Sequence, residues 1–224
     1  MKVRVASLLL MQIGFFYTQA TCAQEPVYKF TTGWYSTQGA NQSNNHGIDL
    51  NLRRSIQDSH TWLAWYQSPE QNLKQPRIGW DSSLPIQHIR IQPSLQAASG
   101  GFVGGSLSIE TGESWFVGAG LGRTNLKPYT NLNFDPNDAW MASGGWRWSE
   151  HHSLSIQIVR DNRQNPDQQH LHLIYRAPIN QKERMTLDIL EKSGMVQESF
   201  TRRYGLSLGY EVSQYFLRVA YDPI

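Results

Sequence analysis

The chain has little cysteine, little net charge and no long apolar run beyond its first residues, and each shortage excludes a class of protein. Its 224 residues include one cysteine, Cys22, so no disulfide can form within the chain. Twenty Lys and Arg stand against eighteen Asp and Glu, and no basic run contains interleaved aromatic residues, which argues against a nucleic-acid partner. The mean hydropathy is −0.50, and after Phe16 no apolar run approaches the roughly 20 residues of a transmembrane helix.

The first residues have the pattern of an export signal. Two basic residues precede the apolar segment Val5–Phe16, and small residues lead to Ala23. The apolar segment has the length of a signal-peptide core and is too short to cross a bilayer as a helix. We therefore predict a cleaved signal peptide over residues 1–23, with cleavage after Ala20 as the alternative, followed by one exported domain over 24–224.

Cys22 lies at this predicted boundary. A lipoprotein signal would use such a cysteine as its lipidated first residue, but the preceding Thr21 departs from the small residue usual there. We therefore favour cleavage over lipidation, and cleavage after Ala23 would leave a mature chain without thiol or disulfide chemistry.

The rest of the chain alternates between apolar and polar residues with a period of two. In "GIDLNLRRS", Ile48, Leu50 and Leu52 alternate with polar residues, and "HLHLIYR", residues 170–176, repeats the pattern. We count about thirteen such segments, of which Gln75–Trp80 is the weakest. No segment has a helical period, so the sequence predicts a single all-β domain. Longer polar loops are predicted at 37–46, 125–138, 161–168 and 192–199.

Two all-β architectures fit this alternation, a soluble β-sandwich and a membrane barrel. The segments match the roughly 9–11 residues with which a tilted strand crosses a bilayer. Aromatic residues gather at the ends of the segments, as membrane interfaces favour: Trp34, Trp62, Trp65, Trp80, Trp115, Trp140, Trp148, Tyr175 and Tyr210. Together with the export signal, these features favour an antiparallel up-and-down transmembrane β-barrel. Because single-chain bacterial barrels have even strand numbers, we expect about twelve strands.

The last segment strengthens this interpretation. Tyr215, Leu217, Val219 and Tyr221 share one face, and the segment resembles the terminal strand of bacterial outer-membrane β-barrel proteins, although Asp222 and two further residues follow it. The resemblance implies the outer membrane of a Gram-negative bacterium as the location. It also implies outer-membrane lipids and the barrel-insertion machinery as partners, and no nucleic acid.

The polar phase of the segments is rich in arginine. In a barrel these side chains would line the lumen and attract anions, as charged rings do in selective pores. The sequence therefore predicts a passive channel or binding barrel for small anionic solutes or oligosaccharides. A structural or envelope-assembly barrel without conductance is an alternative. The predicted lumen residues are Arg53, Arg90, Arg147, Arg176, Arg203 and Arg218.

An enzyme is the other alternative, namely a barrel that hydrolyses or transfers lipid acyl chains. If the turn over residues 177–182 is centred near Asn180, His172 lies opposite Asp188. If the loop over residues 161–168 is centred near Gln164–Asn165, His172 also lies opposite Gln157, with Ser155 diagonal to it. Ser155, His172 and Asp188 would then form a nucleophile, a base and an orienting acid. A slip of one residue in the strand register would remove this arrangement.

No metal or other cofactor is predicted. His170 and His172 share a strand face, but zinc sites need a third ligand that the sequence does not identify. The acidic stretch "NFDPND", residues 133–138, lacks the spacing of a calcium loop and is interpreted as a turn around its proline.

The stretch "WFVGAGLGRT", residues 115–124, suggests a phosphate-binding loop at first sight. It lacks the lysine of such loops, and Arg123 stands where the last glycine of a dinucleotide motif would be. We therefore predict a strand in which Gly118, Gly120 and Gly122 face the lumen and leave space there.

Overall fold

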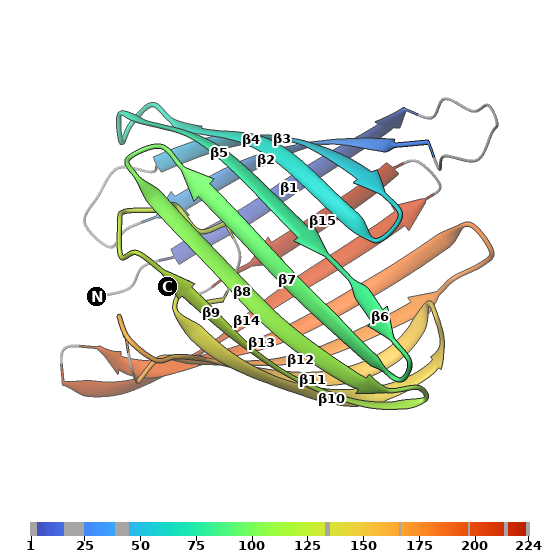
Figure 1. Cartoon of the computed structure of the whole chain (residues 1–224). Coiled ribbons are helices and arrows are strands. Elements are labelled where there is room, and N and C mark those ends of the chain that lie inside the picture. Colours follow the sequence, from blue (N-terminus) through green and yellow to red (C-terminus); the bar gives the residue numbers. More distant parts are fainter. Residues whose placement is uncertain are drawn as a thin grey trace.

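The protein is described from a computed structural model of the whole chain (Figure 1). The described residues are 4–15, 25–38, 45–132, 135–165, 167–196, 198–212 and 215–222. Their regular secondary structure consists of strands: β1 (Arg4–Phe15), β2 (Val27–Gln38), β3 (Asn45–Ile56), β4 (Ser59–Ser68), β5 (Leu73–Ser82), β6 (Leu84–Ile86), β7 (Ile89–Ala98), β8 (Phe102–Gly112), β9 (Trp115–Thr124), β10 (Ala139–Ser149), β11 (His152–Asp161), β12 (Gln169–Pro178), β13 (Glu183–Val196), β14 (Ser199–Val212) and β15 (Tyr215–Tyr221).

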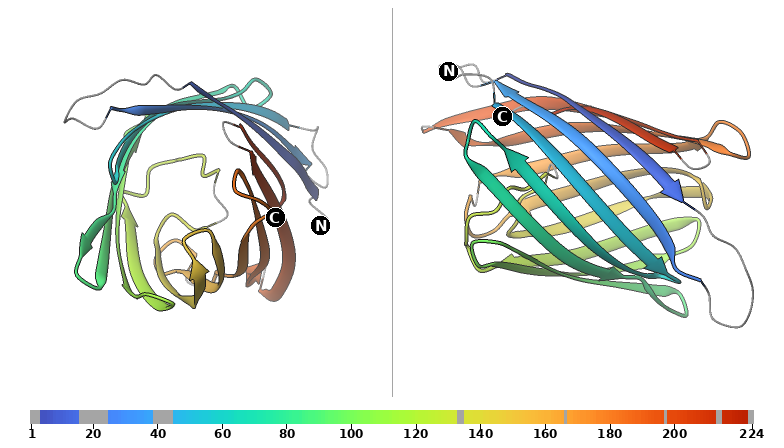
Figure 2. Two further views of the ribbon diagram at one scale, coloured as in Figure 1. Left: turned by 90° about the vertical axis from the view of Figure 1, so that its right-hand side faces the viewer. Right: turned by 90° about the horizontal axis from the view of Figure 1, so that it is seen from above.

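All of these strands belong to one antiparallel sheet, in which neighbours in the chain are neighbours in the sheet. The short β6 continues the course of β5, and both pair with β7, so the described residues run up and down in fourteen passes. The first strand, β1, pairs with β2 on one side and with β15 on the other. Viewed from one end, the sheet curls around a central space (Figure 2, left).

The number of passes differs from the expected twelve for two reasons. The doubtful segment Gln75–Trp80 is a genuine strand, because it lies within β5 and pairs with both β4 and β7. In addition, β1 lies within the predicted signal peptide. The structure is that of the whole chain, so cleavage at Ala20 or Ala23 stays a prediction, and both of these residues lie outside the described ones.

The alternating sequence pattern places apolar residues on the outer face of the sheet and polar residues on the inner face. In β11, Leu154 and Ile156 are exposed, whereas Ser153 and Ser155 are buried. This distribution is the reverse of that of a water-soluble core. The same outward exposure holds for Ile48, Leu50, Leu52, Leu63, Ile78, Val103, Leu107, Ile109, Leu121, Leu173, Ile189, Leu206, Leu208, Leu217 and Val219.

Most of the aromatic residues predicted for the strand ends lie on this outer face. Those exposed there are Trp34, Trp65, Trp115, Trp140, Trp148 and Tyr210. Trp62 differs, because it lies on the inner face of β4 next to Gly79 and lines an interior cavity.

The connections at the two ends of the sheet differ in length. One end has tight turns such as that from β8 to β9, where Gly112 has a φ of +105° and a side chain would strike the backbone of Trp115. The opposite end has the connections 125–138 and 162–168, which are longer. The long loop predicted over 192–199 is wrong, because β13 continues to Val196 and β14 begins at Ser199.

The β9–β10 connection, residues 125–138, does not extend away from the sheet. It folds back and crosses the space that the sheet surrounds (Figure 2, left), and we call it the inner loop. Residues 133 and 134 of the inner loop lie outside the described ones. Its path brings a segment that the sequence marks only as polar against the inner faces of strands on both sides of the molecule.

Candidate functional site

The inner loop is held at its first half by contacts to β5 and β8. The ring of Tyr129 stacks on that of Phe102 with their centroids 4.0 Å apart. The backbone N–H of Thr130 donates a hydrogen bond of 3.0 Å to Oε1 of Gln75, whose side chain is buried. These contacts fix where the inner loop enters the interior.

The end of the inner loop is fixed by Asp138, whose side chain has no exposed surface. Its carboxylate accepts hydrogen bonds from the backbone N–H of Thr124 at 3.0 Å and from the Thr124 hydroxyl at 2.7 Å. Arg163, in the β11–β12 connection, donates to the same carboxylate at 2.8 Å. Burial alone would raise the pKa of Asp138, but these hydrogen bonds and the charge of Arg163 hold the pKa below its usual value.

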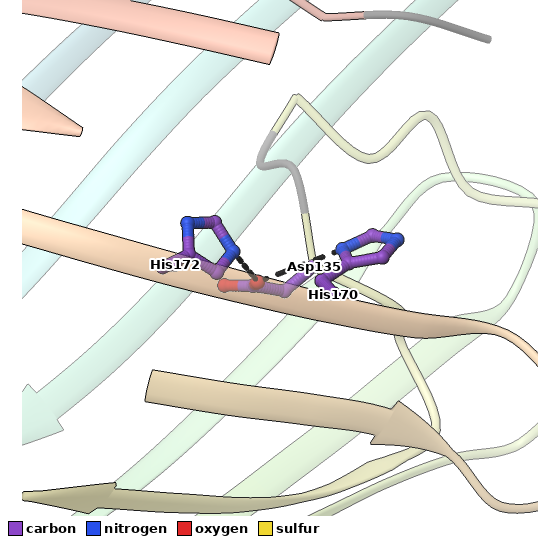
Figure 3. Close-up of side chains that lie close together, drawn as sticks. All are labelled: Asp135, His170 and His172. Atoms are coloured by element: carbon purple, nitrogen blue, oxygen red, sulfur yellow. Dashed lines mark hydrogen bonds and ion pairs between the residues drawn. The ribbon is translucent and has the colours of Figure 1, made fainter. Parts of the chain in front are cut away.

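Between these two anchors, Asp135 reaches the inner face of β12. Its Oδ1 lies 3.0 Å from Nε2 of His172 and 3.8 Å from Nδ1 of His170. Figure 3 shows the carboxylate of Asp135 between the two imidazole rings. The two histidines are two residues apart on one strand, so they project from the same face. The three side chains form a compact cluster that joins the inner loop to β12.

The outer nitrogens of both imidazoles have partners of their own. Nδ1 of His172 lies 3.0 Å from Oδ1 of Asp188 on β13. Nε2 of His170 lies 2.9 Å from the side-chain amide of Gln168. Nδ1 of His170 is buried and has no hydrogen-bond partner among the described residues. The ring nitrogens that point away from Asp135 therefore have partners, whereas Nδ1 of His170, on the side of Asp135, has no hydrogen-bond partner among the described residues.

Asp135 is the most electrostatically perturbed group of the inner loop. Burial would raise its pKa, but the neighbouring imidazole of His170 and the hydrogen bond from His172 lower the pKa well below its usual range. The carboxylate therefore stays ionised and available as a ligand or ion-pair partner at neutral pH.

The structure brings together two of the three residues of the predicted catalytic set. His172 and Asp188 are in contact, and His172 lies opposite Gln157 as predicted. Asp188 pairs with Ile174 rather than directly with His172, so it is a diagonal neighbour. Ser155 also pairs with Ile174, from the other side. The carboxylate of Asp135 occupies the position next to Nε2 of His172 that an attacking hydroxyl would need.

The six predicted lumen arginines lie in different places. Arg53 and Arg218 line a cavity of about 580 Å³. Arg90 and Arg147 lie near the tight turns, where both pair with Glu110, at 3.5 Å and 3.0 Å. Arg176 and Arg203 are exposed near the ends of β12 and β14. The arginines therefore do not form one continuous path.

The cavity that Arg53 and Arg218 line is bounded on one side by the inner loop, through Tyr129, Asn131 and Leu132. Its charged lining consists of four basic and two acidic side chains, so the cavity has a net positive charge: Lys29, Arg53, Arg77, Arg218, Asp49 and Asp81. Asp49 forms an ion pair with Arg77, and Asp81 lies 3.6 Å from Arg53.

The glycine-rich strand is β9, and its glycines make room for their neighbours. A side chain at Gly120 would meet those of Met141 and Ser108, and one at Gly122 would contact the backbone carbonyl of Asn137 in the inner loop. The space left by these glycines is therefore used in part to seat the inner loop.

Asp135 is the residue that the sequence reasoning missed. It lies 35 positions before His170, in a loop whose path no strand register defines. Two signals were present, namely the His-x-His spacing on a strand and the carboxylates of residues 133–138. Only the inward fold of the loop connects them.

Comparison of the chain with protein-family models, with curated proteins and with solved structures gave no match. Among the described residues, no helix is long and apolar enough to cross a membrane. The fold and the inner site define the class of the protein: an all-β chain with one up-and-down antiparallel sheet, an apolar outer face and a polar, charged inner face.

Proposed function

We propose that the sheet is a closed transmembrane β-barrel of the bacterial outer membrane. Within the predicted exported domain, the pairing of β5 with β7 over Arg77–Asp81 and Ser94–Ala98 supports closure. In the whole chain, β1, which belongs to the predicted signal peptide, pairs with both β2 and β15. Closure removes the exposed sheet edges, which lipid does not tolerate. The apolar outer face with aromatic residues near its margins supports a lipid surrounding, because water would leave this surface unburied.

The function that the interior supports best is binding or passage of small polar solutes, with a preference for anions. The observation that carries this proposal is the cavity of about 580 Å³ with its excess of basic side chains. Cationic groups in a confined, partly desolvated space attract anions more strongly than in bulk water. Small anionic solutes or oligosaccharides with anionic groups have the size and charge that this cavity accommodates.

The inner loop makes this a narrow passage rather than a wide one. It crosses the interior between Gln75 on β5 and the histidines of β12 (Figure 2). Solutes in the cavity therefore contact Tyr129 and Asn131 of the inner loop as well as the wall. We expect a small unitary conductance with solute selectivity.

Planar-bilayer recording of the purified full chain tests this function. In a salt gradient, the reversal potential is expected to indicate anion preference, and Arg53→Gln is expected to reduce that preference. Arg90→Gln is the matched control, because Arg90 has a similar exposure and also lies near a carboxylate, that of Glu110. Absence of any conductance, together with absence of solute uptake into liposomes, would contradict the proposal. An equal loss of anion preference in both variants would contradict the role of the cavity.

The membrane assignment has a separate test. A closed barrel in detergent is expected to change its gel migration on heating, and the protein is expected to stay with the membrane fraction in salt-containing buffer. Release into buffer without detergent would contradict the assignment whatever the conductance result.

A further inference from the structure

We propose that Asp135, His170 and His172 bind a divalent transition-metal ion, with Zn²⁺ as the ion that matches this ligand set best. The site would tie the inner loop to β12. The metal site would form in the folded chain whether or not solutes pass through the interior.

The spacing of the ligand atoms suits a metal ion. One oxygen of Asp135, one nitrogen of His170 and one nitrogen of His172 all lie within 4.8 Å of one another. With zinc–ligand distances near 2.0–2.2 Å, ligand atoms at a tetrahedral site are about 3.3–3.6 Å apart. The two distances to Asp135, 3.0 Å and 3.8 Å, bracket this value. Small side-chain rotations bring the three atoms into range.

His170 supplies an independent indication of a ligand. Its side chain is 1% exposed, and its Nδ1 has no hydrogen-bond partner in the part of the chain that the structure describes. This nitrogen points toward Asp135 (Figure 3). Burial of an unsatisfied ring nitrogen costs about 1–3 kcal/mol. A metal ion bound to Nδ1 would remove this cost.

The partners behind the imidazoles match those of metal-binding histidines. Such histidines usually donate their second ring N–H to a carboxylate or another acceptor, which fixes the tautomer and the ring orientation. Asp188 is in that position for His172, at 3.0 Å. For His170, the amide nitrogen of Gln168 lies 2.9 Å from Nε2, and a flip of that amide would present its oxygen as the acceptor. With Nδ1 of His172 donating to Asp188, Nε2 is the nitrogen that would bind the metal ion, in place of its present hydrogen bond to Asp135.

The chemistry of the ligands selects the ion. Two imidazole nitrogens and one carboxylate oxygen favour zinc and its neighbours, whereas calcium and magnesium prefer oxygen ligands alone. Three protein ligands leave a fourth position for water or an anion. Asp135 is 39% exposed and borders an interior cavity with Asn131 and Met141, so the fourth position would face the interior.

Metal titration of the purified full chain in detergent tests the proposal. After treatment with a chelator, the protein is titrated with Zn²⁺ in a calorimeter, and its zinc content is measured after dialysis. The expected result is one Zn²⁺ per chain. His170→Gln and Asp135→Asn are expected to weaken binding at least 10- to 100-fold, roughly the loss that even an outer partner of a metal ligand causes.

His151→Gln is the matched control, because His151 lies in the β10–β11 turn next to Arg184, away from the cluster. It is expected to bind Zn²⁺ like the wild type. Asp135→Asn changes a loop residue and keeps the strands intact, which guards against a variant that fails to fold; heat-dependent gel migration checks this. No zinc binding by the wild type, or equal binding by wild type and His170→Gln, would overturn the proposal. Both results are independent of conductance.

Discussion

Two regions of the inner face neutralise their charged side chains in different ways. In the β3–β5 wall, defined by Asp49, Arg53, Arg77 and Asp81, each cation meets a carboxylate from the same three strands. In the β12–β13 wall, defined by His170, His172 and Asp188, one carboxylate belongs to neither strand: it is that of Asp135 in the inner loop. The first set is complete when the strands pair, and the second set is complete only when the inner loop docks.

Because of this difference, we expect the first set of ion pairs to affect the stability of the sheet and the second set to affect the position of the inner loop. The Asp49–Arg77 pair is almost fully buried, with side-chain exposures of 13% and 6%, so breaking it leaves a buried charge without its counter-ion. The cluster around Asp135 holds a segment that need not be docked for the strands to pair. Changes in the β3–β5 wall are therefore expected to affect unfolding, and changes near the inner loop are expected to affect the loop itself.

The largest expected effect comes from Asp49→Asn. The substitution leaves the guanidinium of Arg77 buried and without its carboxylate, which typically costs about 3–5 kcal/mol. The measurement is the free energy of unfolding from urea titration in detergent, followed by the fluorescence of the eight tryptophans. Asp81→Asn is the control, since Arg53 and Asp81 are 42% and 34% exposed and their pair contributes less than about 1 kcal/mol. Equal losses in both variants would remove the contrast between buried and exposed pairs.

A smaller effect is expected from Asp138→Asn, at the base of the inner loop. The substitution weakens hydrogen bonds from Thr124 and Arg163 and leaves Arg123, 3.9 Å away, without a counter-charge. We expect a loss of about 1–3 kcal/mol together with a larger unitary conductance as the inner loop loosens. Glu113→Gln, in an exposed pair with His88, is the control.

The Asp138 contribution also has a definite pH dependence. Its folded-state pKa is lowered, so the stabilisation is complete above the usual carboxyl pKa of about 3.9 and is lost as the pH falls through the lower, folded value. The difference in unfolding free energy between wild type and Asp138→Asn is therefore expected to shrink below about pH 4. A difference that stays constant from neutral to acid pH would show that the charge of Asp138 is not what holds the loop base.

Much of the sheet follows from local pattern, because alternation fixes both the strands and their faces. The pairing of His172 with Gln157 was predictable from a loop centred between residues 164 and 165. The turn between β12 and β13 is centred one position later than predicted, which moves Asp188 from direct opposition to a diagonal. A shift of two residues in register keeps the same face, so the contact between His172 and Asp188 survives.

The inner loop could not be predicted in the same way. Strand alternation says which face a residue occupies, but it says nothing about the path of residues 125–138. Tyr129 contacts Phe102, and Asp135 contacts His170 and His172, and each of these contacts joins segments that are far apart in the chain. The first strand is a further case: its apolar run has the composition of a signal core, and no period in the sequence marks it as β1.

The smallest expected effect is that of Ser155→Ala, and it decides what the β12–β13 wall does. If Ser155, His172 and Asp188 formed a catalytic set, Ser155→Ala and His172→Gln would change the acyl composition of outer-membrane lipids alike. In the structure, Nε2 of His172 faces Asp135, so we expect Ser155→Ala to leave both the lipid profile and zinc binding at wild-type values and to change stability by less than about 1 kcal/mol. His172→Gln is expected to abolish zinc binding while leaving the lipid profile unchanged, since its role is to hold the loop. Lipid mass analysis of cells carrying each variant, paired with zinc titration of each purified protein, separates the two roles. A lipid change shared by both variants would make the wall a catalytic one and would remove the contrast with the β3–β5 wall.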